Sequence, residues 1–310
     1  MKNNYAYGSL AAFLPLEEKL FPFDPQPVFG RSAPLEVEIG FGTGEYITRV
    51  AAERPGIDLL GFEQCANRII KTLRKVHDLG LNNVRLMRMD AVWGFRYLFP
   101  ARSVSRVHCL FPCPWPKKRH AKHRLFTPAV LRLINSRLVD GAELYIVTDH
   151  RPYASWVADN VPGTGFDIRA RVIPAKFGTK FERKWADAGQ SEFHELTLTK
   201  REHQDMPQGG CAMKTYFFDD ADLGRVRPQD AWGPVTVKFG PLLHDPQLKR
   251  AMVDAVVSED GRAQHIWIMV VHTSKGWCVC PAGGTVVLPT EGAQKAIALV
   301  ADAVRASTLK

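Results

Sequence analysis

The stretch EIGFGTGE, residues 38–45, decides the fold of this chain. It follows a short apolar run at Leu35–Ile39 and precedes a helical pattern over Glu45–Glu53. Alternating glycines let the backbone turn sharply and approach a ligand closely. The motif that binds the pyrophosphate of a dinucleotide is G-x-G-x-x-G, whereas this loop is G-x-G-x-G with an acidic residue on each side. A cofactor that carries an ammonium group suits these two acids better than a pyrophosphate does.

Apolar segments beyond this loop alternate between strand and helix patterns. Such alternation predicts an α/β fold, with a parallel sheet that is covered by helices on both faces. Ligands of these sheets lie at the carboxyl ends of the strands. We expect strands at 35–39, 59–62, 84–87, 107–111, 144–147, 166–172 and 193–199, and helices at 45–53, 66–79, 128–138 and 152–160.

The composition divides the chain into four parts. Residues 1–34 are rich in proline and aromatic residues, which predicts an irregular N-terminal arm. The α/β domain is expected over 35–200, followed by a polar linker at 201–210. Residues 211–310 predict a small α+β domain that resembles no family we can name, and its apolar stripe at 265–271 is more typical of a core strand than of a binding face. Its strands are expected at 235–239, 252–257, 265–272 and 277–280, and its helix at 291–305.

The net charge of +9 comes entirely from the first part of the chain. Residues 1–200 carry 29 Lys and Arg against 20 Asp and Glu, whereas residues 201–310 carry 12 of each. Positions 91–139 alone hold ten Lys and Arg and no acidic residue. Solvated surface charge is usually of mixed sign, so this distribution favours a polyanion-binding surface within the first 200 residues.

The cysteines and the apolar runs indicate the compartment. Six cysteines are scattered, without a CxxC pair or zinc-ribbon spacing. Cys278 and Cys280 could bind a metal, but their spacing more simply places both thiols on one face of a strand. No apolar run reaches the ~18–20 residues that span a bilayer, and the N-terminus does not resemble a signal peptide. We expect a cytoplasmic protein with reduced thiols, no metal and no membrane contact; monomer or homodimer stays open.

Two acidic residues follow the next strands of the predicted sheet. Glu63 ends the strand at 59–62 and could accept hydrogen bonds from ribose hydroxyls, as in nucleotide-binding sheets generally. Asp90 follows the strand at 84–87 and could meet an adenine amino group. Each alone could be an ordinary polar residue at a strand end. Together with the glycine loop and in this order, they form the layout of an S-adenosylmethionine site.

The segment after the fourth strand, LFPCPWPKKRHAKHR at 110–124, combines stiffness, an aromatic ring and positive charge. Three prolines restrict the loop at the ligand edge of the sheet. Residues 117–124 contain five Lys or Arg and two His, and Trp115 offers a face on which a base can stack. This combination suits a flipped or single-stranded nucleotide. A nuclear-import-like basic patch would not explain the prolines.

These segments resemble the bacterial tRNA (guanine-N7)-methyltransferase family over about residues 35–200. The resemblance implies a Rossmann-like, class I S-adenosylmethionine-dependent methyltransferase sheet with S-adenosylmethionine as donor, S-adenosylhomocysteine as product and tRNA as partner. The methylated base would be the variable-loop guanine, position 46 of tRNA. The matching segments are 38–45, 61–63, 90–91, 111–124, 148–153 and 179–183, of which the proline-tryptophan-basic segment is the specific one.

The resemblance also implies roles for individual residues. The implied cofactor contacts are Glu38, Glu63 and Asp90, and the glycine loop and the segment 90–91 add Gly40, Gly42, Gly44 and Ala91 as candidates. The implied substrate contacts are Lys117, Asp149, Thr179 and Glu182, and the stacking and charge of the proline-tryptophan-basic segment add Trp115, Lys118, Arg119, Lys122 and Arg124 as candidates. Catalytic roles fall to Asp149, Glu182 and position 113.

Position 113 departs from the family pattern, which has an aspartate between two prolines where this chain has Cys113. Guanine N7 carries a lone pair and no proton, so its methylation needs alignment with the donor rather than a general base. The base gains positive charge as the bond forms, and carboxylates such as Asp149 and Glu182 would stabilise that charge. A neutral thiol is a weak replacement. We therefore expect methylation at a reduced rate.

Two alternatives differ in class from this enzyme. The chain could be a tRNA-binding homologue that has lost catalysis, because Cys113 permits it. It could also be a methyltransferase that acts on DNA, on a protein or on a small molecule, although the basic loop disfavours a small molecule. The sequence does not indicate which tRNAs are modified or what residues 211–310 do.

Overall fold

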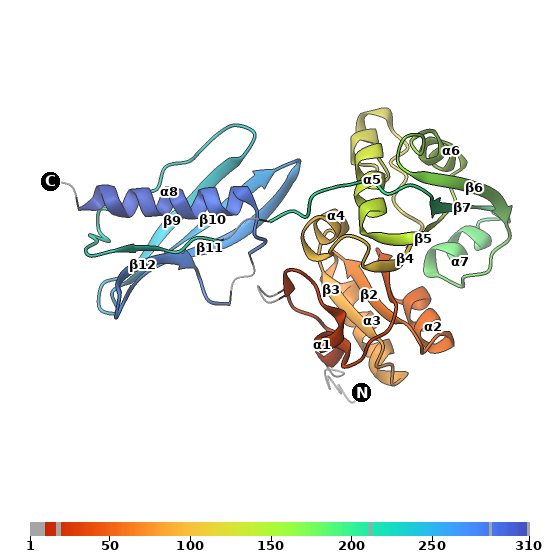
Figure 1. The fold of residues 1–310 in the computed structure, drawn as a ribbon, viewed down its shortest axis with the longest axis horizontal. Coiled ribbons are helices and arrows are strands. Elements are labelled where there is room, and N and C mark those ends of the chain that lie inside the picture. The colour runs from red at the N-terminus through yellow and green to blue at the C-terminus, as the bar shows by residue number, and fades with distance from the viewer. Residues whose placement is uncertain (1–9, 17–19, 211–212, 285–286, 309–310) are drawn as a thin grey trace. The chain divides into compact units, whose positions relative to one another are not determined.

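The computed structural model of the chain describes residues 10–16, 20–210, 213–284 and 287–308. The chain forms two compact units, Met1–Gln208 and Gly209–Lys310. Figure 1 shows the first as a layered α/β unit and the second as an antiparallel sheet with one long helix.

The first unit is built on a seven-stranded sheet with the order β3-β2-β1-β4-β5-β7-β6. The first five strands of the chain run parallel, and β7 is antiparallel to both of its neighbours. This arrangement confirms the predicted parallel sheet and adds an antiparallel end. The strands are β1 (Leu35–Ile39), β2 (Asp58–Glu63), β3 (Val84–Arg88), β4 (Val104–Leu110), β5 (Leu138–Thr148), β6 (Phe166–Ile173) and β7 (Phe193–Lys200).

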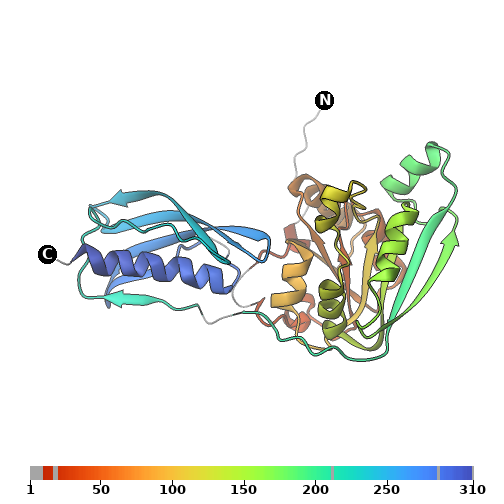
Figure 2. The same cartoon turned by 90° about the horizontal axis from the view of Figure 1, so that it is seen from above.

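Helices cover both faces of this sheet (Figure 2). On one face, α2 and α3 bury Ile47, Val50 and Leu73 against strands β2 and β3. On the other, a π-helical turn at Gly94–Leu98 packs Phe95 against Phe62 of β2. The α-helices are α1 (Pro25–Phe29), α2 (Glu45–Glu53), α3 (Ala66–Asp78), α4 (Ala91–Trp93), α5 (Pro128–Arg137), α6 (Arg151–Asp159) and α7 (Lys180–Asp187).

The glycine that opens α2 shows why this position tolerates no side chain. Gly44 has a φ of 84°, in the left-handed region, and a Cβ on it would lie 2.4 Å from a methyl carbon of Thr72. Helices α2 and α3 therefore approach each other where the glycine loop ends. This close approach fixes the direction in which the loop enters α2.

The N-terminal arm is more regular than we expected. Residues 25–29 form helix α1, which begins with a cap by Asp24 and proline in its first turn. Phe23 is 3% exposed, and its ring packs edge-on against Phe99 at 5.9 Å. The prediction of an irregular arm was wrong for this helix, since a single turn fixed by its cap and by packing leaves no periodic pattern. Residues 1–9 and 17–19 of the arm lie outside the described residues.

The polar stretch that we expected to be a linker follows the surface of the first unit as far as residue 208. The buried guanidinium of Arg137 donates hydrogen bonds to the carbonyl oxygens of Met206 and Pro207, both at 2.9 Å. The amide of Gln208 donates to the carbonyl of Tyr97 at 3.2 Å. The two compact units consequently meet in sequence between residues 208 and 209.

The second unit is a five-stranded antiparallel sheet with the order β8-β12-β11-β10-β9, packed on helix α8. Along β11 the exposure alternates, so that Ile266, Ile268 and Val270 lie in the core. The stripe at 265–271 is therefore a core strand, as predicted. The elements are β8 (Tyr216–Phe218), β9 (Thr236–Asp245), β10 (Arg250–Glu259), β11 (Arg262–Thr273), β12 (Gly276–Pro281) and α8 (Glu291–Ser307).

The described residues include neither a membrane-spanning helix nor a metal-binding group of side chains. Among them, no helix is long and apolar enough to cross a membrane. In the same part of the chain, no three His, Cys, Asp or Glu side chains form a group that could hold a metal ion. Cys278 and Cys280 lie two residues apart on strand β12, and Cys211 lies outside the described residues.

Candidate functional site

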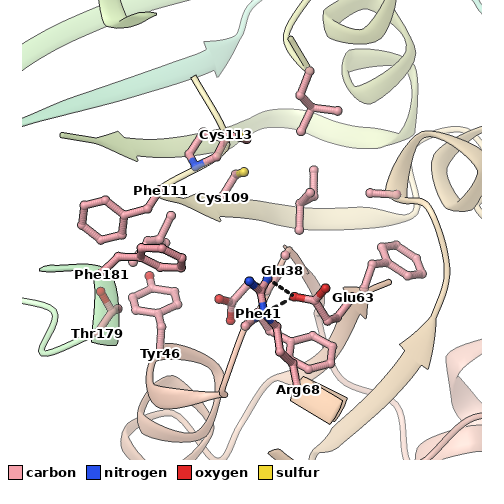
Figure 3. A pocket seen from close by; sticks show the side chains of 18 of the residues that line it. Glu38, Phe41, Tyr46, Glu63, Arg68, Cys109, Phe111, Cys113, Thr179 and Phe181 are labelled. Carbon is pink, nitrogen blue, oxygen red and sulfur yellow. Dashed lines mark hydrogen bonds and ion pairs between the residues drawn. The ribbon is translucent and has the colours of Figure 1, made fainter. Parts of the chain in front are cut away.

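A pocket of about 530 Å³ lies at the carboxyl ends of strands β1 to β4. It is the edge at which parallel sheets bind their ligands. Figure 3 shows Glu63 and Arg68 on one side of the pocket, and Phe111, Phe181 and Thr179 on the other. We call the first side, with the glycine loop, the donor half, because the methyl donor is expected there. We call the second side the acceptor half, because the base that accepts the methyl group is expected there.

Glu38 is the most unusual residue of the donor half. Its side chain lines the pocket but is only 2% exposed, and one of its carboxylate oxygens has no hydrogen-bond partner among the residues that the structure describes. Burial, with a smaller contribution from the nearby Glu45, raises the pKa of Glu38 to about 8. A buried carboxylate without a partner is costly. A cationic ligand group at this point would satisfy it.

Glu63 is fixed by hydrogen bonds from the backbone. Its carboxylate accepts from the amides of Gln64 and Cys65 at 2.8 and 3.0 Å, and from the amide of Gly42 at 3.2 Å. Arg68 adds an ion pair at 3.3 Å, although its side chain is 45% exposed. Glu63 thus ties the end of β2 to the glycine loop. Its orientation toward the pocket is set before any ligand arrives.

Of the remaining cofactor residues predicted from the sequence, all but Gly44 line the pocket. Asp90 caps helix α4 by accepting from the amide of Val92 at 2.9 Å, and it lines the pocket together with Ala91. Gly40 and Gly42 also line the pocket. Gly44 does not line it, and its lack of a side chain is explained by the close approach of α2 and α3.

The proline loop after β4 lines the acceptor half of the pocket. Cys113 and Trp115 both line the pocket, and Cys113 is exposed. Phe111 and Trp115 have positive φ angles of 55° and 45°, a conformation that bulky residues rarely adopt. The ring of Trp115 packs against His123 at 5.2 Å. Tertiary contacts, rather than local preference, therefore set this loop.

Within the following segment His123 lines the pocket, whereas the lysines and arginines do not. They flank or form the short 3-10 helix Lys118–His123. Arg124 folds back on the loop, where it donates to the carbonyl of Pro114 at 3.0 Å and lies over the ring of Trp156 at 5.1 Å. Arg124 therefore holds the proline loop. The exposed side chains that remain for a polyanion are Lys117, Lys118, Arg119 and Lys122.

The last three predicted residues come from distant segments. Asp149 follows β5 and lines the pocket, as does Thr179, which caps α7 by accepting from the amide of Glu182 at 3.1 Å. The side chain of Glu182 is 2% exposed and does not line the pocket. Its carboxylate accepts hydrogen bonds from the backbone amides of residues 176–178.

A chain of hydrogen bonds that we did not predict runs from the surface at Arg54 through the buried Glu36 and His108 and fixes Tyr46 in the pocket wall. Arg54 forms an ion pair with Glu36 at 2.6 Å, and Glu36 contacts His108 Nε2 at 2.8 Å. Burial raises the pKa of Glu36, but the bonds from His108 and Arg54 outweigh it, so the pKa is lowered. The ionised Glu36 makes His108 Nε2 the donor, which leaves Nδ1 to accept from the Tyr46 hydroxyl at 3.0 Å. No sequence pattern joins these four positions.

Three more aromatic residues of the acceptor half were not predicted. They are Phe111 at the end of β4, and Phe181 and Trp185 on helix α7, and all three line the pocket. Phe181 lies within the segment 179–183, which the sequence analysis had singled out for its polar residues. The spacing of Phe181 and Trp185 by four residues places both on one face of a helix. That helical spacing was the available signal.

Several known proteins are similar to this chain. A family model described as "Putative methyltransferase" matches residues 32–195. The tRNA (guanine-N(7)-)-methyltransferase of Chlorobium phaeobacteroides is 44% identical over 54% of this chain and 83% of its own length. The protein of that name from Coprothermobacter proteolyticus is 29% identical and covers 96% of this chain and 94% of itself, so its match extends through the second unit. The solved 16S rRNA methyltransferase KamB covers 57% of this chain and 92% of itself at 17% identity, with a TM-score of 0.47.

The strand order and the three carboxylates at successive strand ends define a class I S-adenosylmethionine-dependent methyltransferase. Within that class, the family model and the relatives show which branch this is. The chain belongs to the bacterial tRNA (guanine-N7)-methyltransferase family. Because the relatives carry the names of enzymes, the comparisons do not favour the alternative of a homologue without turnover.

Proposed function

We propose that this chain transfers a methyl group from S-adenosylmethionine to N7 of the variable-loop guanine of a tRNA. The observation that carries the proposal is that one pocket combines carboxylates suited to the methyl donor with an aromatic and basic border suited to a nucleic acid. Buried and backbone-fixed carboxylates form the donor half, and the Pro-Trp loop with the basic segment 117–124 borders the acceptor half. The names of the relatives support the choice of tRNA as the methyl acceptor.

The donor half fits S-adenosylmethionine, which supplies a methyl group activated on a sulfonium. The ammonium group of its methionine part would satisfy the unpartnered oxygen of Glu38. Glu63 would accept hydrogen bonds from the ribose hydroxyls, in competition with the exposed Arg68. Asp90, whose backbone position is fixed as the cap of α4, would meet the adenine amino group.

The acceptor half needs no general base, because guanine N7 is an unprotonated lone pair. Its task is to align N7 with the methyl group, and such alignment can lower a barrier by roughly 7–11 kcal/mol. The base becomes positive during the reaction, and Asp149, which lines the pocket, is the carboxylate placed to stabilise that charge. Glu182 contributes indirectly, by holding residues 176–178.

The exposed lysines and arginines next to the pocket would neutralise tRNA phosphates. Phosphate contacts position a nucleic acid without reading its sequence. Binding through Lys117, Lys118, Arg119 and Lys122 should therefore weaken steeply with added salt. A cytoplasmic location, where such a substrate is available, stays our expectation.

Incubation of the purified chain with labelled S-adenosylmethionine and unmodified tRNA tests the proposal. We expect label in 7-methylguanine, located in the variable loop by nuclease mapping. A K117A/K118A/R119A variant should bind tRNA more weakly with a shallower salt dependence. Binding of tRNA without transfer of label, or label in any other nucleoside, would contradict the proposed function.

A further inference from the structure

Phe181 is a large apolar side chain that lines the pocket and leaves part of its ring exposed to it. It is 41% exposed and lines the acceptor half. Two other aromatic residues there have ring partners, since Tyr46 packs against Phe177 at 5.8 Å and Phe111 against Phe193 at 5.7 Å. Within the part of the chain that the structure describes, no aromatic ring contacts Phe181. An exposed aromatic ring in a pocket is a usual feature of a ligand contact.

The helix that carries Phe181 is fixed to the domain through its first turn. Thr179 caps α7, and the carboxylate of Glu182 accepts from the amides of Lys176 and Phe177 at 2.6 and 2.7 Å. From α2, Arg49 donates to the carbonyl of Phe177 at 2.8 Å. Phe181 lies between the capping residue and Glu182, so its Cα cannot shift without breaking these bonds.

A second anchor ties the same segment to the sheet. Glu195 of β7 is 1% exposed, and it forms an ion pair with Lys176 at 2.7 Å. Burial raises the pKa of Glu195, but hydrogen bonds from Lys176, Tyr145 and Arg171 outweigh it and lower the pKa to about 2. Glu195 is therefore ionised and keeps its hold on Lys176 over the whole range in which the enzyme can be assayed.

The position of Phe181 assigns its ring to the methyl acceptor rather than to the donor. Figure 3 shows Phe181 with Phe111 and Thr179 on one side of the pocket. Glu63, which belongs to the donor half, lies on the opposite side. The ammonium, ribose and adenine of the donor are expected at Glu38, Glu63 and Asp90, and Asp90 lies next to Glu63 because it accepts from the side-chain amide of Gln64 at 3.3 Å. The aromatic side of the pocket is matched to a planar base.

We propose that the ring of Phe181 stacks on the target purine and stabilises the positive charge that the purine gains. The inference rests on the proposed function and deepens it. Bases stack on aromatic side chains whatever their sequence, and the negative face of an aromatic ring attracts a cation. Methylation at N7 turns a neutral guanine into a cationic one, so the contact strengthens along the reaction.

The test compares three substitutions at this position. F181L keeps an apolar side chain without the ring, F181A removes both, and F181Y keeps the ring. We expect kcat/KM for tRNA to fall roughly ten- to hundredfold in F181A and F181L, and to stay within threefold in F181Y. Binding of S-adenosylmethionine, measured by calorimetry, should not change. The matched control is I70A, whose side chain on α3 is 42% exposed and does not line the pocket.

Two outcomes would overturn the stacking role. One is an F181L variant as active as the wild type. The other is a loss of donor binding in F181L equal to its loss of activity, which would indicate a structural role. If the wild type forms no 7-methylguanine, the proposed function fails. Stacking is then judged by tRNA affinity in the presence of S-adenosylhomocysteine, which must be weaker for F181L than for F181Y.

Discussion

The donor half and the acceptor half of the pocket share one sheet edge but are built in different ways. The donor half comes from the ends of three adjacent strands, where Glu38 is buried and Glu63 is bonded to the backbone. The acceptor half comes from the loop after β4, from Asp149 after β5, and from α7 between β6 and β7. Long-range bonds, such as the one from Arg49 to the carbonyl of Phe177, hold it together.

This difference predicts how each half responds to mutation. The charged group of the methyl donor has no alternative partner once its buried carboxylate is removed. A substitution of that carboxylate should therefore abolish binding of the methyl donor. Stacking and phosphate contacts are distributed over several side chains. A loss in the acceptor half should therefore reduce the rate with tRNA and leave donor binding intact.

The largest effect is expected for Glu38→Gln. This substitution removes the charge that the donor ammonium would meet while keeping the shape of the side chain. We expect the Kd for S-adenosylmethionine, measured by calorimetry, to rise by at least about a hundredfold. Glu53→Gln, on the exposed end of α2, is the control and should bind normally. Unchanged affinity in E38Q would remove Glu38 from the donor half.

The same carboxylate should make stability depend on pH. Its pKa is about 8 in the folded chain against an ordinary 4.5, so between these values the folded chain holds a proton that the unfolded chain releases. The free energy of unfolding contributed by Glu38 thus falls as pH rises through this window, by at most about 1.4 kcal/mol per pH unit. Above pH 8 it levels off.

Denaturant unfolding of the wild type and E38Q at pH 6 to 9 measures this dependence. The variant, which cannot titrate at position 38, should gain stability over the wild type as the pH rises toward 8. The donor half would then be stabilised by the substitution that destroys its function. A difference that stays constant with pH would show that Glu38 titrates normally.

A smaller effect is expected for Glu182→Gln, which tests the acceptor half. An amide has one acceptor oxygen, so the variant cannot accept all the backbone hydrogen bonds from residues 176–178. We expect kcat/KM for tRNA to fall about tenfold and the free energy of unfolding to fall by about 1–3 kcal/mol, with donor affinity unchanged. Glu192→Gln, at an exposed position, should change neither. A drop in donor affinity as large as the drop in rate would contradict the separation of the halves.

The smallest effect, and the only gain, is expected for Cys113→Asp. A carboxylate at this exposed position of the proline loop would face the base as it becomes cationic. We expect the methylation rate of the purified enzyme to rise, by up to about tenfold. An unchanged rate would show that position 113 has no part in the reaction.

Local patterns in the sequence predicted the donor half well. The strand ends, the glycine loop and the order of Glu38, Glu63 and Asp90 follow from periodicity and from turn residues a few positions apart. Helix α7 was missed because its eight residues are mostly charged, and its start depends on bonds from Glu182 to the preceding loop. The three-residue strand β8 is likewise too short for a periodic signal.

The sequence by itself determined the fold class, the family and the place of the glycine loop and of three acidic residues at strand ends, because each depends on neighbours along the chain. Only the tertiary structure decided that Glu182 faces the backbone, that Arg124 holds the proline loop, and that Phe181 stands in the pocket. The position of Phe181 depends on contacts between segments far apart in sequence, such as α2 with the loop before α7. The contacts of Glu182 and Arg124 join nearby residues, but irregular loops without a periodic pattern bring these residues together. The geometry of such contacts is set by packing and hydrogen bonding in three dimensions.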